Sequence, residues 1–223
     1  MKNKNFIFIC LLFLNYQNAI AGWPDVIEPP QSQSKKMVKE MYVNGVPVSV
    51  KFFNSRLSPE RVVSFYRNRW ADNFAESDSG PWQQISQLTN KYFITVQVKD
   101  GNDRGTQGRI NITKLTKNKR KVGKDIPMML QSTILSEVVT KDELTISTMI
   151  LLFNEYSVDE NIQFYKNYFS KDNWVSIIDK SRPDIGSTQV YKNETDELSV
   201  TIKSVAGIST VVLNKVVKRG WFN

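Results

Sequence analysis

SPERVVSFYRNRW, residues 58–70, recurs 99 positions later as SVDENIQFYKNYF, residues 157–169. A serine, an acid, an apolar position, Phe-Tyr, a cation, Asn and a closing aromatic return in the same order without a gap. Internal similarity of this kind indicates a chain built from two similar parts. The pattern therefore predicts an architecture, and by itself it specifies no chemistry.

Each copy carries the signals of an α-helix. Ser58 suits the N-cap, Pro59 suits the first helical position, and Glu60 complements the positive end of the helix dipole. In the second copy Glu160 follows Ser157 by three residues, which is the spacing of a capping box. The apolar residues that share one helix face are Val63, Tyr66 and Trp70 in the first copy and Ile162, Tyr165 and Phe169 in the second. We expect one helix from Ser58 to about residue 73 and another that begins at Ser157.

A β-hairpin is predicted before each helix. Met37–Val43 and Val46–Phe53 flank Asn44-Gly45, a pair that suits a type I′ turn because both central residues take positive φ. Ile134–Thr140 and Leu144–Phe153 form the second hairpin. A polar turn is expected at 76–81. Further strands are predicted after the helices, at 82–88, 92–99 and 108–115 in the first copy and at 174–179, 188–193, 198–205 and 208–217 in the second.

These elements predict an α+β fold of two tandem similar units, each an antiparallel sheet (β-β-α-β-β with an extra strand) packed by one helix. The second unit is expected to hold one strand more than the first. A single sheet continuous through both units is the alternative. The predicted divisions are a signal peptide at 1–21, an extended N-terminal arm at 22–36, a first unit at 37–116, a basic linker at 117–126, a second unit at 127–217 and a C-terminal tail at 218–223.

The first 21 residues have the pattern of a signal peptide. Lys2 and Lys4 precede the apolar run Phe6–Leu14, and Ala19-Ile20-Ala21 matches the small-x-small cleavage pattern. This run is shorter than the roughly 20 apolar residues that span a bilayer, so an uncleaved anchor is the less favoured alternative. Cys10, the only cysteine of the chain, lies inside this segment. We expect a periplasmic or secreted protein with no transmembrane span after signal removal.

The chain that follows the signal peptide is moderately basic. It carries 28 Lys and Arg (30 less Lys2 and Lys4) against 22 Asp and Glu, a net charge of +6. An anionic surface or glycan is a possible partner for such a chain, and a protein partner in the envelope is the favoured one. The densest cluster of cations includes Lys119, Arg120 and Lys121, and it predicts either an anion-binding patch or, as favoured, a solvated linker. Nucleic acid is not expected, because exposed aromatics interleaved with cations are not evident.

The composition excludes most familiar catalytic designs. The chain has no histidine, and no cysteine follows Cys10. Ser-His-Asp and Cys-His catalysis and the usual zinc sites are therefore impossible. The loop that begins at Asp100 resembles a calcium loop, but its twelfth position is Asn111 instead of the required Glu. We predict no catalytic residue, no metal site, no cofactor and no enzymatic activity.

A few residues are candidate partner contacts. Phe65 and Phe164 lie one step off the buried stripe of each helix, so they flank the expected core. Trp221 and Phe222 end the chain after several cations, and a terminal aromatic pair makes a good interface anchor. Lys119, Arg120 and Lys121 complete the set as the possible anion-binding patch.

The function predicted from these features is that of an exported, non-enzymatic binding or adaptor protein of the cell envelope. It would act through protein-protein contacts, as an assembly or secretion-system accessory component. One alternative is an enzyme that acts on envelope polysaccharide with two carboxylates from different segments of one pocket. A second alternative is a carrier of a small ligand or lipid, which requires a large apolar pocket between helix and sheet.

Overall fold

The computed structural model describes residues 22–36, 40–102, 105–124, 126–171 and 173–219. The elements up to residue 114, called the first half below, are β1 (Ser32–Lys36), β2 (Glu40–Val43), β3 (Val46–Ser55), α1 (Pro59–Trp70), β4 (Ala75–Ser79), β5 (Trp82–Leu88), β6 (Tyr92–Asp100) and β7 (Thr106–Lys114). Those of the second half are β8 (Thr133–Lys141), β9 (Thr145–Asn154), α2 (Val158–Phe169), β10 (Val175–Arg182), β11 (Gly186–Lys192), β12 (Asp196–Val205) and β13 (Ile208–Lys218).

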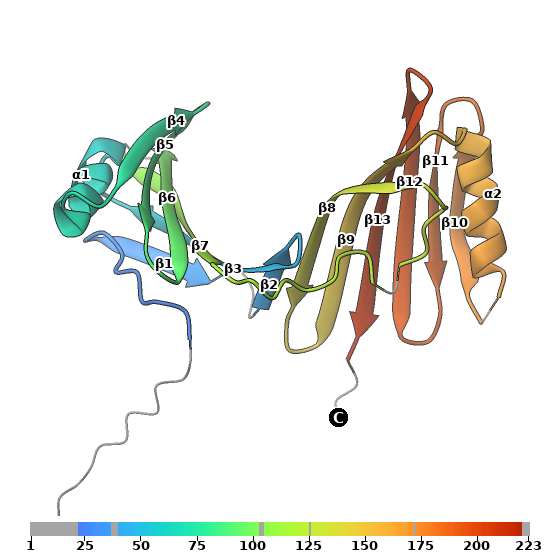
Figure 1. The fold of residues 1–223 in the computed structure, drawn as a ribbon, viewed down its shortest axis with the longest axis horizontal. Coiled ribbons are helices and arrows are strands. Elements are labelled where there is room, and N and C mark those ends of the chain that lie inside the picture. Colours follow the sequence, from blue (N-terminus) through green and yellow to red (C-terminus); the bar gives the residue numbers. More distant parts are fainter. Residues whose placement is uncertain (1–21, 37–39, 103–104, 125, 172, 220–223) are drawn as a thin grey trace, which may run out of the picture.

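The predicted fold class, two tandem α+β units, is wrong. The described strands form one 13-stranded sheet in the order β10-β11-β12-β13-β9-β8-β2-β3-β7-β6-β5-β4, with β1 paired to β3 beside this path. Every pairing is antiparallel, and the only helices described are α1 and α2 (Figure 1). The protein is therefore mostly β, and the alternative of one continuous sheet describes it.

The strand order repeats within this sheet. Outward from the junction, the first half runs β2-β3-β7-β6-β5-β4 and the second runs β8-β9-β13-β12-β11-β10. Four strands follow each helix, so the expectation of an extra strand in the second unit is wrong. The missed strand is β4, at a position predicted to be a polar turn. Its five residues are all exposed and lack apolar alternation, so periodicity gave no signal for it.

The junction between the halves is an edge-to-edge pairing of β2 with β8. Met41 lies opposite Thr140, and these two residues are 99 positions apart, the same offset as the two helices. Each of the two also holds the same place in its own hairpin, opposite Val48 and Ser147. The edge of the first half thus meets its own counterpart antiparallel, which is the geometry of an isologous interface.

Side chains and backbone reinforce the junction. The backbone N–H of Asn44 donates to the Glu137 carbonyl at 2.9 Å, and the Glu137 N–H donates to Asn44 Oδ1 at 2.8 Å. Lys141 and Glu40 form an ion pair across the junction at 2.9 Å. The hydrogen bond from the Tyr42 hydroxyl and then the one from Lys141 lower the pKa of the Glu40 carboxyl. Two strands at equivalent positions of the two halves are therefore joined by backbone hydrogen bonds, a side-chain amide contact and an ion pair.

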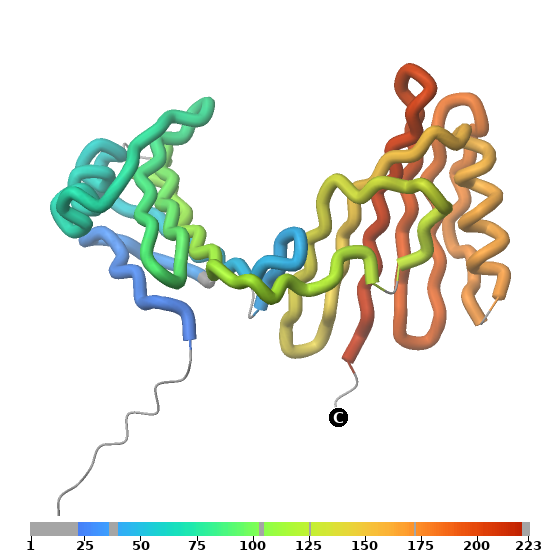
Figure 2. The backbone as a smooth tube through the Cα atoms, viewed as in Figure 1, coloured from blue at the N-terminus to red at the C-terminus, as the bar shows by residue number. Residues whose placement is uncertain are grey.

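The segment between β7 and β8 crosses this junction (Figure 2). The Arg120 N–H donates to the Gly45 carbonyl at 2.9 Å, and the Gly123 N–H donates to the Glu137 carboxylate at 2.8 Å. Gly45 has φ +75°, and an added Cβ there would lie 2.1 Å from the Arg120 carbonyl oxygen. Glycine is needed at this position for both its backbone conformation and its space.

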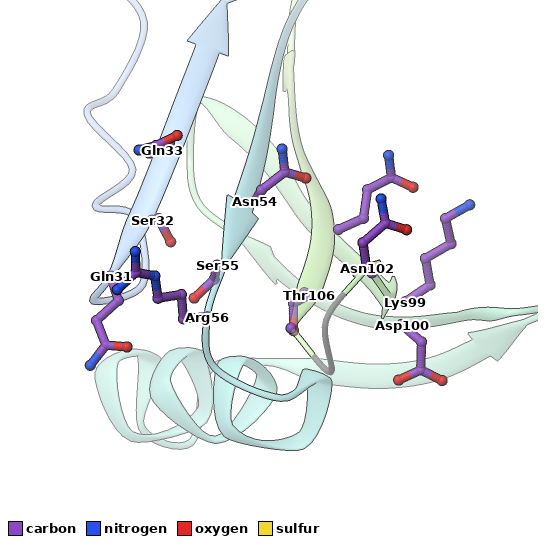
Figure 3. A pocket seen from close by; sticks show the side chains of 13 residues that line it. Gln31, Ser32, Gln33, Asn54, Ser55, Arg56, Lys99, Asp100, Asn102 and Thr106 are labelled. Atoms are coloured by element: carbon purple, nitrogen blue, oxygen red, sulfur yellow. The ribbon is translucent and has the colours of Figure 1, made fainter.

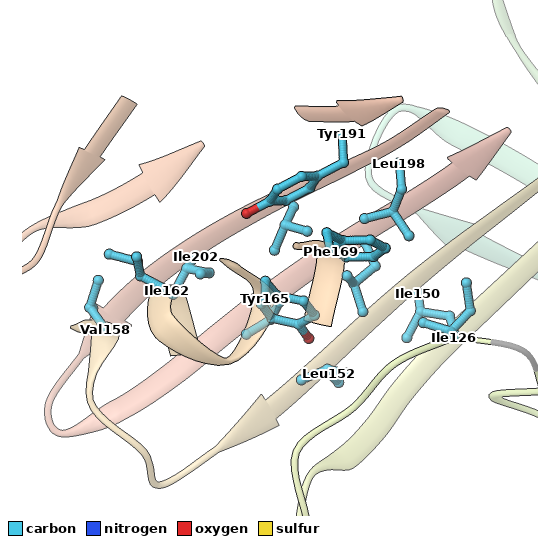
Figure 4. Packing of buried hydrophobic residues seen from close by; sticks show 13 residues of the cluster. Ile126, Ile150, Leu152, Val158, Ile162, Tyr165, Phe169, Tyr191, Leu198 and Ile202 are labelled. Carbon is cyan, nitrogen blue, oxygen red and sulfur yellow. The ribbon is translucent and has the colours of Figure 1, made fainter. Parts of the chain in front are cut away.

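Each half has its own core between its helix and the sheet. In the first, Val62, Val63 and Tyr66 of α1 are buried against strands β5, β6 and β7. In the second, Ile162, Tyr165 and Phe169 of α2 are buried against β10, β11 and β12 (Figure 4). The predicted helix stripes are thus largely buried, with Trp70 partly so. Segments before the first strand of each half also reach these cores, through Val26 and Ile126.

Several local predictions are confirmed. Asn44 and Gly45 both have positive φ, at 49° and 75°, as a type I′ turn requires. Ser157 forms the capping box with Glu160, its hydroxyl accepting from the Glu160 N–H at 3.2 Å. Ser58 occupies the N-cap of α1 but makes no side-chain capping bond.

The buried polar pair Asn154 and Asn161 generates a stability prediction. The two side chains exchange amide hydrogen bonds at 2.9 and 3.0 Å, and the first half has Ser55 and Val62 at the matching positions. Asn154→Ala leaves the buried Asn161 Oδ1 without its donor, while Asn161 Nδ2 keeps its bond to the Ser157 carbonyl at 2.9 Å, and the free energy of unfolding should fall by about 1–3 kcal/mol. The double variant Asn154→Ser with Asn161→Val reproduces the first half and should recover most of this loss in urea denaturation. A double variant that is less stable than Asn154→Ala would contradict this explanation.

The buried tyrosines generate a prediction for alkaline pH. Desolvation raises the pKa of Tyr66 and of Tyr165 well above 10, and raises that of Tyr191 to about 12. Above pH 10 the unfolded chain loses these protons and the folded chain keeps them, so stability present below pH 10 falls as the pH rises. Each such group steepens the fall by up to about 1.4 kcal/mol per pH unit. Tyr165→Phe should make the decline of unfolding free energy between pH 10 and 12 shallower, and an unchanged decline would refute the assignment.

Candidate functional site

Both halves make the same hydrogen bond just before the helix, where the chain leaves the preceding strand. Thr106 Oγ1 donates to the Leu57 carbonyl at 2.7 Å, and Ser209 Oγ donates to the Tyr156 carbonyl at 2.6 Å. Leu57 and Tyr156 are again 99 positions apart. Contacts kept in both halves are explained by the shared strand order. Surfaces present in only one half have no such explanation, and they are the candidates for function.

The outer edges of the sheet differ in this way. β4 ends the first half and β10 ends the second. β4 is a short edge of polar and acidic residues, AESDS, apart from Ala75. β10 is longer, VSIIDKSR, and it exposes Val175, Ile177 and Ile178 to 62%, 51% and 41%. Ile185, in the turn that follows, is 63% exposed. Large apolar side chains on an unpaired edge are what folded proteins usually avoid.

Ile178 and Ala75 hold the same position in the two halves. The cross-strand ladder from Ile178 runs through Val190, Ser199 and Asn214 to Met149. The ladder from Ala75 runs through Ser86, Thr95 and Asn111 to Val50. Val50 and Met149 are 99 positions apart. The apolar edge of β10 is therefore a property of its sequence, and the strand order does not impose it.

Charges alternate along the second part of β10. Asp179 pairs with Lys166 of α2 at 2.8 Å, and the hydrogen bonds from Lys166 and Ser181 lower the pKa of the Asp179 carboxyl. Lys180 and Arg182 alternate with Asp179 and Ser181, so they lie on the open face of the sheet, opposite the helix. A backbone edge, exposed apolar side chains and two exposed cations thus occur on one strand.

The residues that were predicted from the sequence to contact a partner do not lie together in the structure. Phe65 and Phe164 are half-buried, each edge-to-face on the neighbouring buried tyrosine with ring centroids 5.0 Å apart. Since both halves make this contact, it belongs to the cores. The two helices lie at opposite ends of the molecule (Figure 1), so these two residues do not form one site.

The predicted cations have different environments. Lys119 and Lys121 are exposed, whereas Arg120 is half-buried with its guanidinium 5.9 Å from the centre of the Tyr42 ring. Arg120 is thereby engaged at the junction, and the three cations do not present one common surface. Trp221 and Phe222 lie outside the described residues.

A hollow of about 520 Å³ between α1 and β4 collects Glu60, Glu76 and Asp78. Arg67 lowers the pKa of the Glu76 carboxyl, and backbone hydrogen bonding lowers that of Glu60. A carboxylate pair that hydrolyses glycosides needs one member with a raised pKa to act as the acid. Within the described residues no group of three or more His, Cys, Asp or Glu is arranged to hold a metal ion.

Comparison with protein-family models, curated proteins and solved structures found no significant match. Among the helices described, neither is long and apolar enough to cross a membrane. The candidate site therefore depends on the geometry of β10 and on its contrast with β4. This edge could not be predicted from the sequence, because alternation predicts a strand without indicating which strands lie beside it. The one available signal was the adjacent pair Ile177-Ile178, which cannot place both side chains on one covered face.

Proposed function

We propose that this chain is an exported, non-enzymatic binding protein of the cell envelope that acts as an adaptor or assembly component. Its contact with a partner protein is the edge of β10, to which an extended segment of the partner adds as a further antiparallel strand. The observation that carries this proposal is the exposure of Val175, Ile177 and Ile178 on an edge that no other described strand pairs with.

Strand addition fits the physical properties of this edge. An edge strand offers a row of backbone N–H and carbonyl groups that a partner strand can pair with. The same sheet already joins β2 to β8 in this manner at its centre. Covering the apolar side chains of β10 would remove them from water, and full burial of one isoleucine contributes about 1.5–3 kcal/mol.

The side chains of β10 define the chemistry of the partner strand. Residues directly opposite one another in an antiparallel pair lie on the same face. The partner therefore needs apolar residues beside Val175 and Ile178, and acidic residues beside Lys180 and Arg182. An extended segment that is apolar in one part and acidic in the other meets both requirements.

Export is supported by the leader pattern of residues 1–21. The carboxylate enzyme is less well supported, since the pKa values of Glu60 and Glu76 are lowered. The lipid carrier is also less well supported. Buried side chains fill the spaces between helix and sheet in both halves, and the hollow between α1 and β4 is lined mainly by polar residues.

The proposal predicts which peptides the protein will bind. Eight-residue peptides selected from a displayed library on the full chain should be enriched in extended sequences that combine apolar and acidic residues. Ile178→Lys should weaken the binding of these peptides roughly tenfold or more, as measured by calorimetry, because one apolar contact is replaced by a charge. Hydrogen exchange of the complex should show new protection of amides in β10.

The matched control is Ala75→Lys, at the same position of the other sheet edge, which should leave peptide affinity unchanged. Both positions are exposed, so neither variant should change the thermal midpoint appreciably. Selected peptides that bind Ile178→Lys as tightly as the wild type, or a library that yields no binder, would count against strand addition at β10.

A further inference from the structure

A second surface found in one half only is a polar hollow of about 980 Å³ in the first half (Figure 3). It lies where β1, β3, β6 and β7 end, beside the loop from Gly101 to Gly105. Its amide side chains are those of Gln31, Gln33, Asn54, Asn102 and Gln107. The lining also includes serine and threonine hydroxyls, Arg56, Lys99 and Asp100, and none of the described residues that line it has a large apolar side chain.

This lining favours a ligand rich in hydroxyl groups. Each amide side chain carries both a donor group and an acceptor oxygen, and a sugar hydroxyl likewise donates and accepts. The Oγ of Ser32 is buried and, within the described residues, has no hydrogen-bond partner. An apolar ligand would find little to pack against in this hollow, whereas most lipid and drug-like sites are predominantly apolar.

The charges favour an acidic ligand. Among the described lining residues, the two cations Arg56 and Lys99 outnumber the one carboxylate, that of Asp100, so these residues carry a net positive charge. Among the described residues, neither Arg56 nor Lys99 forms an ion pair. A guanidinium group can bind a carboxylate through two parallel hydrogen bonds.

The polar surface continues from the hollow across the open face of the sheet. Lys99 Nζ lies 4.8 Å from the centre of the Trp82 ring, and the Arg109 guanidinium lies 4.6 Å from it. Gln97 accepts from Arg109 at 2.6 Å and donates to Gln84 at 2.7 Å. The side chains beside the hollow are therefore held in a network, which suits a ligand longer than one sugar ring.

An aromatic side chain borders this polar surface. Phe52 is 39% exposed and lies opposite Arg109 in the pairing of β3 with β7. A pyranose ring has an apolar C–H face that can pack on an aromatic ring, while its hydroxyls reach neighbouring amides.

The second half has a different lining at the same positions. Asn54 and Gln107 lie opposite one another, and their counterparts are Phe153 and Thr210, which also pair. Arg56 is replaced by Glu155. The lining residues Gly101, Asn102 and Gly105 have no counterparts, because a two-residue turn, Ala206-Gly207, joins the matching strands. The hollow is therefore not a consequence of the shared strand order.

We propose that this polar hollow binds an acidic oligosaccharide, with a uronic-acid carboxylate at Arg56 and ring hydroxyls at Asn54 and Gln107. The proposal goes beyond the function assigned to β10, since the two surfaces belong to different halves of the sheet. It would let one chain hold a glycan and a protein strand at the same time.

The test is calorimetric titration of the full chain with tetrasaccharides of galacturonic, glucuronic and mannuronic acid, and with their carboxyl-reduced forms. At least one acidic tetrasaccharide should bind, and its reduced form should bind roughly tenfold more weakly. Arg56→Ala should weaken the binding of the acidic tetrasaccharide by a similar factor. It should leave the affinity for the reduced form unchanged, because only the acidic form has a carboxylate that Arg56 can bind. Asn54→Ala with Gln107→Ala should weaken both.

The matched controls are Glu155→Ala and Thr210→Ala in the second half, which should leave sugar affinity unchanged. Arg56→Lys should bind the acidic sugar more tightly than Arg56→Ala and less tightly than the wild type, because lysine keeps the positive charge but cannot form two parallel hydrogen bonds to a carboxylate. Thermal midpoints of all variants report whether the fold is retained. The proposal is overturned if no tetrasaccharide binds, if the pocket variants bind as tightly as the wild type, or if a single-stranded DNA octamer binds more tightly through Arg56.

Discussion

The pairing of β2 with β8 is the interaction on which this architecture depends. It pairs the inner edge strands of the two halves with each other and leaves β4 and β10 as the outer edges of one sheet. Because Met41 meets Thr140, its own counterpart, the junction has the form of a dimer interface contained in a single chain. The crossing segment fixes this arrangement further, since its backbone binds Gly45 on one side and Glu137 on the other.

Because the two halves share one strand order, comparing them distinguishes the side chains that the fold requires from those that are free to serve recognition. Tyr66 and Tyr165 keep the same buried side chain in the two cores, whereas the buried positions of Val62 and Asn161 differ. Exposed positions diverge, as Ala75 and Ile178 do on the outer edges and Asn54 and Phe153 do on the open face. The polar hollow and the apolar edge lie in different halves (Figure 1), so occupation of one does not obstruct the other. This arrangement is consistent with an adaptor that connects two different ligands.

Local features of the fold could be predicted from the sequence, and long-range ones could not. The capping box at Ser157, the turn at Asn44-Gly45 and the buried faces of both helices depend on residues close together in the chain. The single sheet depends on which strand lies beside β8, and alternation along a strand carries no information about its neighbour. The strand β4 was missed for a related reason, because an exposed edge needs no apolar alternation.

The residues of the candidate sites could not be predicted from the sequence either, because they are brought together only by long-range pairing. Phe65 and Phe164 were predicted to be contacts because they lie off the helix stripe, but each packs on the tyrosine beside it. Residues of the polar hollow come from β1, β3, β6 and β7, and only the sheet pairing brings them together. No spacing along the chain could have indicated that group.

Hydrogen exchange at the junction tests the central claim, that the two halves form one sheet. In an isolated first half the amide of Asn44, in a hairpin turn, would be open to water, whereas here it donates to the Glu137 carbonyl. If the two halves form one sheet, the amides of Asn44 and Glu137 exchange as slowly as those within the β2–β3 hairpin. Exchange of both amides at the rate of exposed loop residues would contradict it.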